Sequence, residues 1–253
     1  MPIEDKAAFE SEQLKPFDIT GASAYVRGLA KMSTSMEDLA VATTRYLFDS
    51  LTTEPGSLKA CALVRFFRTI EFQHLEPRLQ TMVCDATGKK RPTDKCLTLL
   101  GSAGLEEKWN RRQDSTGHQV IPLISPEIVE ESPMIARLIT QLGIEISTLF
   151  TAPKSQKMQF NDPKDRDYNI FYVPDAQTSP FIPAKSEFVF PYSIRSVIGF
   201  GSLLPNGDLY AVVLFFRVLL PDLIPKQFTA LALSTTIAVL STPNEAIFSS
   251  TVD

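Results

Sequence analysis

The sequence contains few of the residues that build catalytic or metal sites. Its 253 residues include three cysteines, two histidines and one tryptophan. No two cysteines have the short spacing of a zinc site, and neither the G-x-x-x-x-G-K loop nor the dinucleotide-binding G-x-G-x-x-G occurs. A nucleophile with its base cannot be assembled from spacing alone. We therefore predict no catalytic residue and no metal ligand, and the sequence names no cofactor.

The sequence also lacks an excess of basic charge. It has 25 Lys and Arg against 29 Asp and Glu, a net charge of −4, so nucleic acid is not expected as a partner. No uninterrupted apolar run reaches the roughly 18 residues that a membrane span needs. The N-terminus, Met1-Pro2-Ile3-Glu4-Asp5, lacks the basic-then-apolar order of a signal peptide. We expect a cytoplasmic protein with no membrane partner, and three cysteines without a motif fit a reducing compartment.

What the chain does contain is a strong hairpin signal. Apolar runs at 194–204 and 209–217 flank Pro205-Asn206-Gly207-Asp208. Asn-Gly between two apolar runs predicts a hairpin with a type I′ turn, in which both central residues have positive φ. Both runs are apolar at odd and even positions alike, so both faces of the hairpin should be covered.

A helix from Gln227 to Leu240 is predicted to follow the hairpin. Its apolar residues form two stripes, Phe228, Leu231, Ala232, Thr235 and Val239 on one side and Ala230, Leu233, Ile237 and Leu240 on another. A helix that is apolar on two sides is expected to be buried on two sides. One side should pack on the sheet, and the other needs a second helix from this chain or from a partner.

The rest of the chain supplies further elements without the regular strand-helix alternation of a parallel sheet. A capping box at Thr34 and Glu37 predicts a helix over 35–51. Strands are expected at 59–68, 96–104, 144–150 and 168–173, and helices at 75–84 and 133–142. The fold class should be α+β, a central antiparallel sheet of about six strands with flanking helices. We divide the chain into an N-terminal arm (1–32), one domain (33–241) and a disordered C-terminal tail (242–253).

Several aromatic and polar residues could line a ligand pocket, which needs apolar walls and a few convergent polar groups. These candidates are Trp109, Arg112, His118, Tyr172, Phe181, Tyr192 and Arg195. Each also has a structural alternative. The two tyrosines could be core residues with wet hydroxyls, the arginines could be solvated, and His118 could lie at the surface.

The C-terminal stretch resembles the end of a GAF domain, a sensory α/β module of bacterial signalling proteins. The likeness lies in Val197-Ile198-Gly199, Ala211-Val212-Val213-Leu214 and the helix around 231–238. The stretches 95–100 and 117–123 resemble the GAF-like regions found ahead of histidine kinases. Over 33–240 the resemblance implies a six-stranded antiparallel sheet with helices on one side and pocket-forming loops on the other. It also implies a small-molecule ligand and dimerisation through terminal helices.

The sequence departs from the ligand motifs of that family. The Asn-Lys-Phe-Asp-Glu motif of cyclic-nucleotide binders is absent, and so is the Cys-His pair of bilin binders, so no ligand class carries over. The GAF-like methionine sulfoxide reductases use cysteines, and Cys61, Cys84 and Cys96 invite that comparison. Cys61 and Cys96, however, lie inside apolar strands, where buried structural thiols are the usual case.

We therefore expect a non-catalytic GAF-like sensory or regulatory module of bacterial signal transduction. It would bind an unidentified small molecule, dimerise through terminal helices, or do both. Its protein partner would be a second copy of the chain or a signalling protein such as a histidine kinase. The alternatives are a thiol-dependent enzyme of the methionine sulfoxide reductase type and a ligand-free dimerisation domain.

Overall fold

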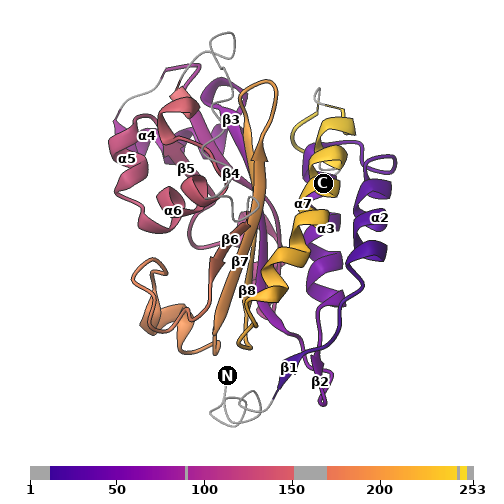
Figure 1. The fold of residues 1–253 in the computed structure, drawn as a ribbon. Coiled ribbons are helices and arrows are strands. Elements are labelled where there is room, and N and C mark those ends of the chain that lie inside the picture. The colour runs from indigo at the N-terminus through magenta and orange to yellow at the C-terminus, as the bar shows by residue number, and fades with distance from the viewer. Residues whose placement is uncertain (1–11, 89–90, 151–169, 244–245, 250–253) are drawn as a thin grey trace.

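The centre of the molecule is a six-stranded sheet in which all neighbouring strands are antiparallel (Figure 1). The computed structural model describes residues 12–88, 91–150, 170–243 and 246–249. Across the sheet the order is β5 (Val120–Leu123), β4 (Lys95–Gly104), β3 (Cys61–Glu71), β8 (Leu209–Phe216), β7 (Ser196–Leu203) and β6 (Ile170–Val173). The predicted antiparallel sheet of about six strands with flanking helices is confirmed.

Helices lie on both sides of this sheet (Figure 1). On one side are α2 (Ile19–Leu29), α3 (Met36–Ser50) and α7 (Leu223–Ser241). Towards the other side are α5 (Pro126–Glu130) and α6 (Pro133–Gln141), with the short helical turns η2 (Glu107–Trp109), η4 (Ile146–Phe150) and η7 (Lys185–Val189). Helix α4 (Pro77–Thr87) lies beside the edge strand β5, and its buried Leu79 and Val83 belong to the same core cluster as α2, α3 and α7. Two further turns are η1 (Phe72–His74) and η3 (Arg112–Asp114). A separate two-stranded ribbon joins β1 (Gln13–Leu14) to β2 (Thr53–Glu54). The central strands are thus covered on both faces, as their continuous apolar sequences predict.

The predicted hairpin forms, but its turn is not type I′. Within the turn only Gly207 has positive φ, at 80°. Gly207 N donates to Leu204 O (2.8 Å), and Leu204 N donates to Asp208 O (2.7 Å). Pro205 holds a φ near −65°, which suits the first central position of a type I turn and forbids a positive φ there. The loop therefore takes an extra residue, with the glycine in the left-handed conformation after the turn.

The capping box of α3 lies one residue later than predicted. Ser35, not Thr34, is the N-cap, and its Oγ accepts from Asp38 N (3.0 Å) while Asp38 Oδ2 accepts from Ser35 N (3.0 Å). Glu37 cannot complete a box from Thr34 because its carboxylate binds Arg112 (2.6 Å). The helix itself is confirmed.

The strand predicted over 144–150 is wrong. Residues Ile146–Phe150 form a 3₁₀ turn, η4, which begins near a bond from Thr148 N to Glu145 O (2.9 Å). Leu149 of this turn is buried against the face of the sheet opposite α2, α3 and α7. A short apolar run without period-2 alternation does not distinguish a strand from a helical turn.

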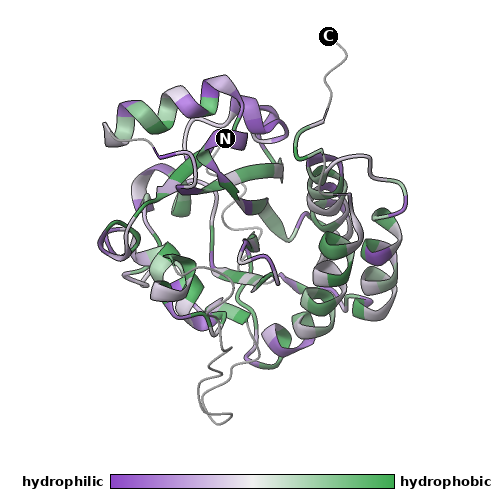
Figure 2. Cartoon of the chain, turned by 90° about the horizontal axis from the view of Figure 1, so that it is seen from above, coloured by the Kyte–Doolittle hydropathy of each residue, from purple (hydrophilic) through white to green (hydrophobic). Residues whose placement is uncertain are grey.

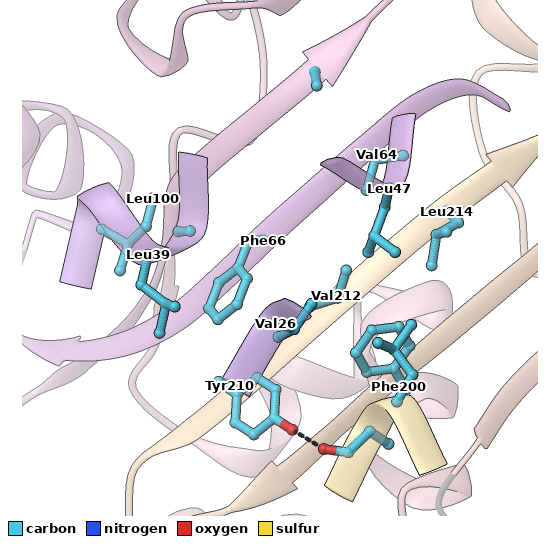
Figure 3. Close-up of a cluster of buried hydrophobic side chains, with 14 of the residues drawn as sticks. Val26, Leu39, Leu47, Val64, Phe66, Leu100, Phe200, Tyr210, Val212 and Leu214 are labelled. Carbon is cyan, nitrogen blue, oxygen red and sulfur yellow. Dashed lines mark hydrogen bonds between the residues drawn. The ribbon is translucent and has the colours of Figure 1, made fainter. Parts of the chain in front are cut away.

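The larger core cluster lies between the sheet and the helices α2, α3 and α7 (Figure 3). Tyr210 is fully buried there and points its hydroxyl towards α7, where it donates to Ala232 O (2.9 Å). Burial raises the pKa of Tyr210, so the phenol stays protonated. Gly101 lets α3 approach the sheet closely, because a Cβ at this position would lie 2.4 Å from the backbone of Ala40.

Helix α7 is apolar on two sides, as predicted. The helix has 19 residues, and an 18-residue window within it has a mean hydropathy of 1.4, so it is long and apolar enough to cross a membrane by length and composition alone. One side packs into the core with Phe228, Leu231, Ala232, Thr235 and Val239. That burial is typical of the core helix of a globular domain. In the view from above, hydrophobic residues run through the strands and the helices beside them (Figure 2).

The segments before and after the main domain contact the helical layer. Within the predicted arm, α2 packs beside α7, and Arg27 Nη1 donates to Ser234 Oγ (2.7 Å). Within the predicted tail, Ala246 O and Ile247 O accept hydrogen bonds from Met36 N (3.0 Å) and Glu37 N (2.9 Å). The domain boundaries at 32 and 241 stay a prediction. Residues 1–11 and 250–253 of the arm and tail lie outside the described residues.

Candidate functional site

Two of the predicted site residues, Trp109 and Tyr192, are in contact. Their ring centroids are 4.5 Å apart, and Phe188 lies 5.6 Å from Trp109. Phe188 in turn meets Phe215 of β8 at 5.1 Å, so this aromatic group packs on the sheet face opposite α2, α3 and α7. Burial, with a contribution from Glu106, raises the pKa of Tyr192. These rings form a wall of the second core cluster.

Arg112 is buried in an ion-pair network. Its Nε and Nη2 donate to the two carboxylate oxygens of Glu37 (2.6 and 3.0 Å). Its Nη1 and Nη2 donate to Glu76 (2.9 and 2.8 Å), and the guanidinium lies 4.8 Å from the Phe248 ring centroid. Burial would lower the pKa of Arg112, but the two glutamates raise it. These contacts join α3, the residue before α4 and the segment after α7. The role of Arg112 is therefore structural.

His118 lies near Arg65, a half-buried residue of β3. Arg65 Nη2 donates to Ser115 Oγ (2.9 Å) and Nη1 to Gly117 O (3.5 Å). Burial lowers the pKa of Arg65 to about 10. His118 is exposed at the surface, and partial desolvation together with the charge of Arg65 lowers the pKa of its imidazole. His118 has a φ of 59°, the left-handed conformation.

The remaining candidates occupy three further settings. Tyr172 lines a cavity of about 330 Å³ with Gln141, Asp222 and Lys226, and its hydroxyl donates to Leu220 O (2.6 Å). Phe181 lies under the guanidinium of Arg137 (4.3 Å). Arg195 N donates to Phe216 O (2.7 Å), and its buried Nε has no partner among the described residues. Apart from Trp109 and Tyr192, no two candidates are joined by a hydrogen bond, an ion pair or a ring contact within the described residues. Their role as one ligand site stays a prediction.

The larger cavity, of about 870 Å³, lies at one end of the sheet. At this end of the sheet β3 ends, β4 begins and the β7–β8 turn passes, and it is the upper end in Figure 1. Polar residues from these elements line it, namely Arg68, Glu71, Asp94, Lys95, Asn206 and Asp208. Its apolar lining comes from Leu123, Pro126, Leu149, Phe150 and Ile247. We call this cavity the sheet-end cleft, and its size falls within the range of small-molecule sites.

None of the residues predicted from the sequence lines the sheet-end cleft. The signal that could have found it is Arg68, a charged residue at the end of an apolar strand. The predicted strand ends at Arg68, whereas β3 continues to Glu71, which places Arg68 within the sheet. Asp208, predicted only as part of a turn, is its ion-pair partner (3.1 Å).

Cys61 and Cys96 lie too far apart to act as one thiol pair. Cys61 pairs with Phe216 at one end of β3, whereas Cys96 pairs with Ile70 near the other end. Nine residues of strand separate these positions, roughly 30 Å at 3.3 Å per residue. Burial raises the pKa of Cys61 and raises that of Cys96 to about 12, with a smaller contribution from Asp94. Neither thiol forms the reactive thiolate at neutral pH.

We expect only Cys84 to react quickly with Ellman's reagent in the native protein at pH 8, because it alone is not buried. All three thiols should react in guanidinium chloride. The Cys84→Ser variant is the control and should remove the fast phase. Rapid modification of Cys61 or Cys96 in the folded chain would contradict the burial described above.

Within 12–88, 91–150, 170–243 and 246–249, no group of three or more His, Cys, Asp or Glu side chains could hold a metal ion.

No family model matches the sequence, and no curated protein does. Among solved structures the chain is similar to the free methionine-R-sulfoxide reductase of Neisseria meningitidis in complex with its substrate, at 11% identity and a TM-score of 0.48, covering 91% of this chain and 95% of that one. It is similar to fRMsr of Staphylococcus aureus, at 10% identity and 0.44, covering 91% and 99%. It is also similar to the phycocyanobilin-bound GAF domain of a cyanobacterial phytochrome, at 10% identity and 0.43, covering 89% and 94%. These likenesses concern the fold alone.

Proposed function

We propose that this chain is a non-catalytic, cytoplasmic GAF-like regulatory module of bacterial signal transduction that self-associates through α7. The observation that carries the proposal is an apolar stripe on the outer side of this helix. Leu223, Leu233, Ile237 and Leu240 are 71%, 63%, 44% and 55% exposed. The sequence resemblance at 196–240 supports the GAF-like assignment.

The spacing of this stripe favours a helix of the same kind as its partner. Positions 223, 226, 230, 233, 237 and 240 alternate steps of three and four residues, the a and d positions of a heptad. Lys226 is the only charged residue among them. A second copy offers the identical stripe, so the two surfaces are self-complementary about a two-fold axis. The paired stripes would bury the apolar area that the monomer leaves in water.

Sedimentation analysis tests this proposal. We expect the wild-type chain to be a dimer at micromolar concentration and the double variant Leu233→Glu/Ile237→Glu to be a folded monomer, because each dimer would bury four unpaired carboxylates. Leu219→Glu is the control, since Leu219 is 50% exposed but lies outside α7. It should leave the dimer intact. A wild-type chain that stays monomeric at high concentration would overturn the proposal.

The sheet-end cleft supports a second part of the function, the binding of a small molecule. Ile247 lines the cleft, and its carbonyl oxygen accepts from Glu37 N at the start of α3 (2.9 Å). Residues 246–249 follow α7 in the chain. A ligand in the cleft would therefore contact the segment that follows α7 and is hydrogen-bonded to the start of α3. It could shift the packing of these helices, and an output partner such as a histidine kinase would respond to that shift.

The buried thiols favour this regulatory module over the alternative, a methionine sulfoxide reductase-type enzyme. Such an enzyme needs a thiolate that reaches its substrate. The only cysteine that is not buried is Cys84, which lies on α4.

A further inference from the structure

The guanidinium of Arg68 is buried in the lining of the sheet-end cleft with most of its donors unused. The side chain is 5% exposed. Nη2 donates to Asp208 Oδ2 (3.1 Å), while Nε and Nη1 are buried and have no hydrogen-bond partner in the described part of the chain. An arginine has five N–H donors and no acceptor. Buried charged donors without partners are rare in folded proteins, and each one calls for an acceptor.

The carboxylate that pairs with Arg68 has other partners as well. Asp208 accepts from Arg68, and its Oδ2 also accepts from Asn206 Nδ2 (2.7 Å). Its Oδ1 lies 3.8 Å from Lys95 Nζ. Lys95 also donates to the carbonyl oxygen of Gly207. Asp208 thus forms ion pairs with both Arg68 and Lys95. Burial lowers the pKa of Lys95, while the charges of Asp208 and Glu71 oppose this shift.

The other acidic residues of the cleft have partners of their own. Glu71 accepts from Gln73 Nε2 (2.7 Å) and lies 3.7 Å from His74 Nδ1. Asp94 accepts from the backbone N of Arg91 (3.0 Å) and lies 3.1 Å from its Nε. Neither is bonded to Arg68. Arg68 lines the cleft, so a rotation of its guanidinium would present these buried donors to an acceptor from outside the chain.

From these contacts we infer that the sheet-end cleft binds the oxyanion group of a small organic acid, a carboxylate or a phosphate monoester, through Arg68 and Lys95. Anionic oxygens form the strongest hydrogen bonds that a guanidinium makes. The apolar lining from Leu123, Leu149 and Phe150 suits the carbon body of such a ligand. This inference rests on the proposed function in one respect, that the cleft is the ligand site of the module.

The test is a titration of the full chain with phenyl phosphate, benzoate and neutral benzamide at constant ionic strength, followed by amide NMR shifts around the cleft. We expect one of the two anions to bind at least about tenfold more tightly than benzamide, the effect of one charge-assisted hydrogen bond. The anion that binds more tightly distinguishes a phosphate from a carboxylate ligand. Arg68→Met should weaken anion binding by about tenfold or more, and Arg68→Lys, which keeps the charge but has fewer donors, by less.

Two further variants keep the test decisive if Arg68→Met does not fold. Lys95→Met should weaken anion binding, since Lys95 is 19% exposed in the cleft, whereas Arg91→Met, at a residue 74% exposed at the cleft mouth, should not. Benzamide binding as tightly as both anions would overturn the anion assignment and leave the cleft a ligand site. If none of the probes shifts the cleft resonances, the cleft is not the ligand site either. Self-association through α7 is judged separately by sedimentation.

Discussion

Replacing Arg112 by methionine is expected to lower the free energy of unfolding by about 3–5 kcal/mol, the usual cost of removing one partner from a buried ion pair. Glu37 is 7% exposed and would keep its charge without a cation beside it. The variant would also lose the contact between the guanidinium and Phe248. Urea unfolding at pH 7, followed by circular dichroism, measures the change.

Arg111→Met is the matched control for this prediction. Arg111 is 73% exposed and its Nε lies 3.7 Å from Asp114, so its loss should change stability by no more than about 0.5 kcal/mol. Adding Glu37→Gln to the Arg112 variant should recover part of the loss, because the buried charge is then gone. Equal effects of the Arg111 and Arg112 variants would contradict the role given to the network.

The elements that could be predicted from the sequence are those with a local signal. Asn206-Gly207 between two apolar runs predicted the hairpin. The apolar stripes over 227–240 predicted α7, which in the structure begins four residues earlier, at Leu223. The predictions that were wrong concern the turn type and the capping residues, which depend on the residues around them. Pro205 changed the turn type, and the ion pair of Glu37 with Arg112 moved the capping box of α3 to Ser35 and Asp38. Local sequence patterns predict that an element forms, but contacts made in the folded chain determine where it begins and ends.

The cleft could not be predicted because its residues are far apart in the chain. Arg68 and its partner Asp208 are separated by 140 residues, and Arg112 and Glu37 by 75. No rule of sequence spacing predicts contacts between residues so far apart in the chain, because the order of the strands in the sheet determines which of them meet. The candidates Trp109 and Tyr192 were chosen for their type, and the structure joins them in an aromatic wall rather than at a cavity. A buried arginine is recognised only once the strand that carries it is placed in the sheet.

The two sides of α7 are expected to respond differently to truncation. Phe228 is 1% exposed, with the rings of Phe17, Phe200 and Phe216 centred 6.4, 6.4 and 6.3 Å from its own. Phe228→Ala should cost about 3–5 kcal/mol, the lost transfer energy plus a cavity between helix and sheet. Leu233 lies on the same helix but is 63% exposed. Leu233→Ala should change the stability of the monomer by no more than about 0.5 kcal/mol.

Urea unfolding of both variants at a low and a high protein concentration separates the roles of the two sides. Because the stability of a dimer rises with protein concentration, Leu233→Ala should reduce the difference between the two midpoints that the wild-type chain shows. Phe228→Ala should lower the midpoint at both concentrations, since the buried stripe holds the helix on its own sheet. If Leu233→Ala instead destabilises the chain equally at both concentrations, the outer stripe serves the monomer fold, and its role as a dimer seam fails.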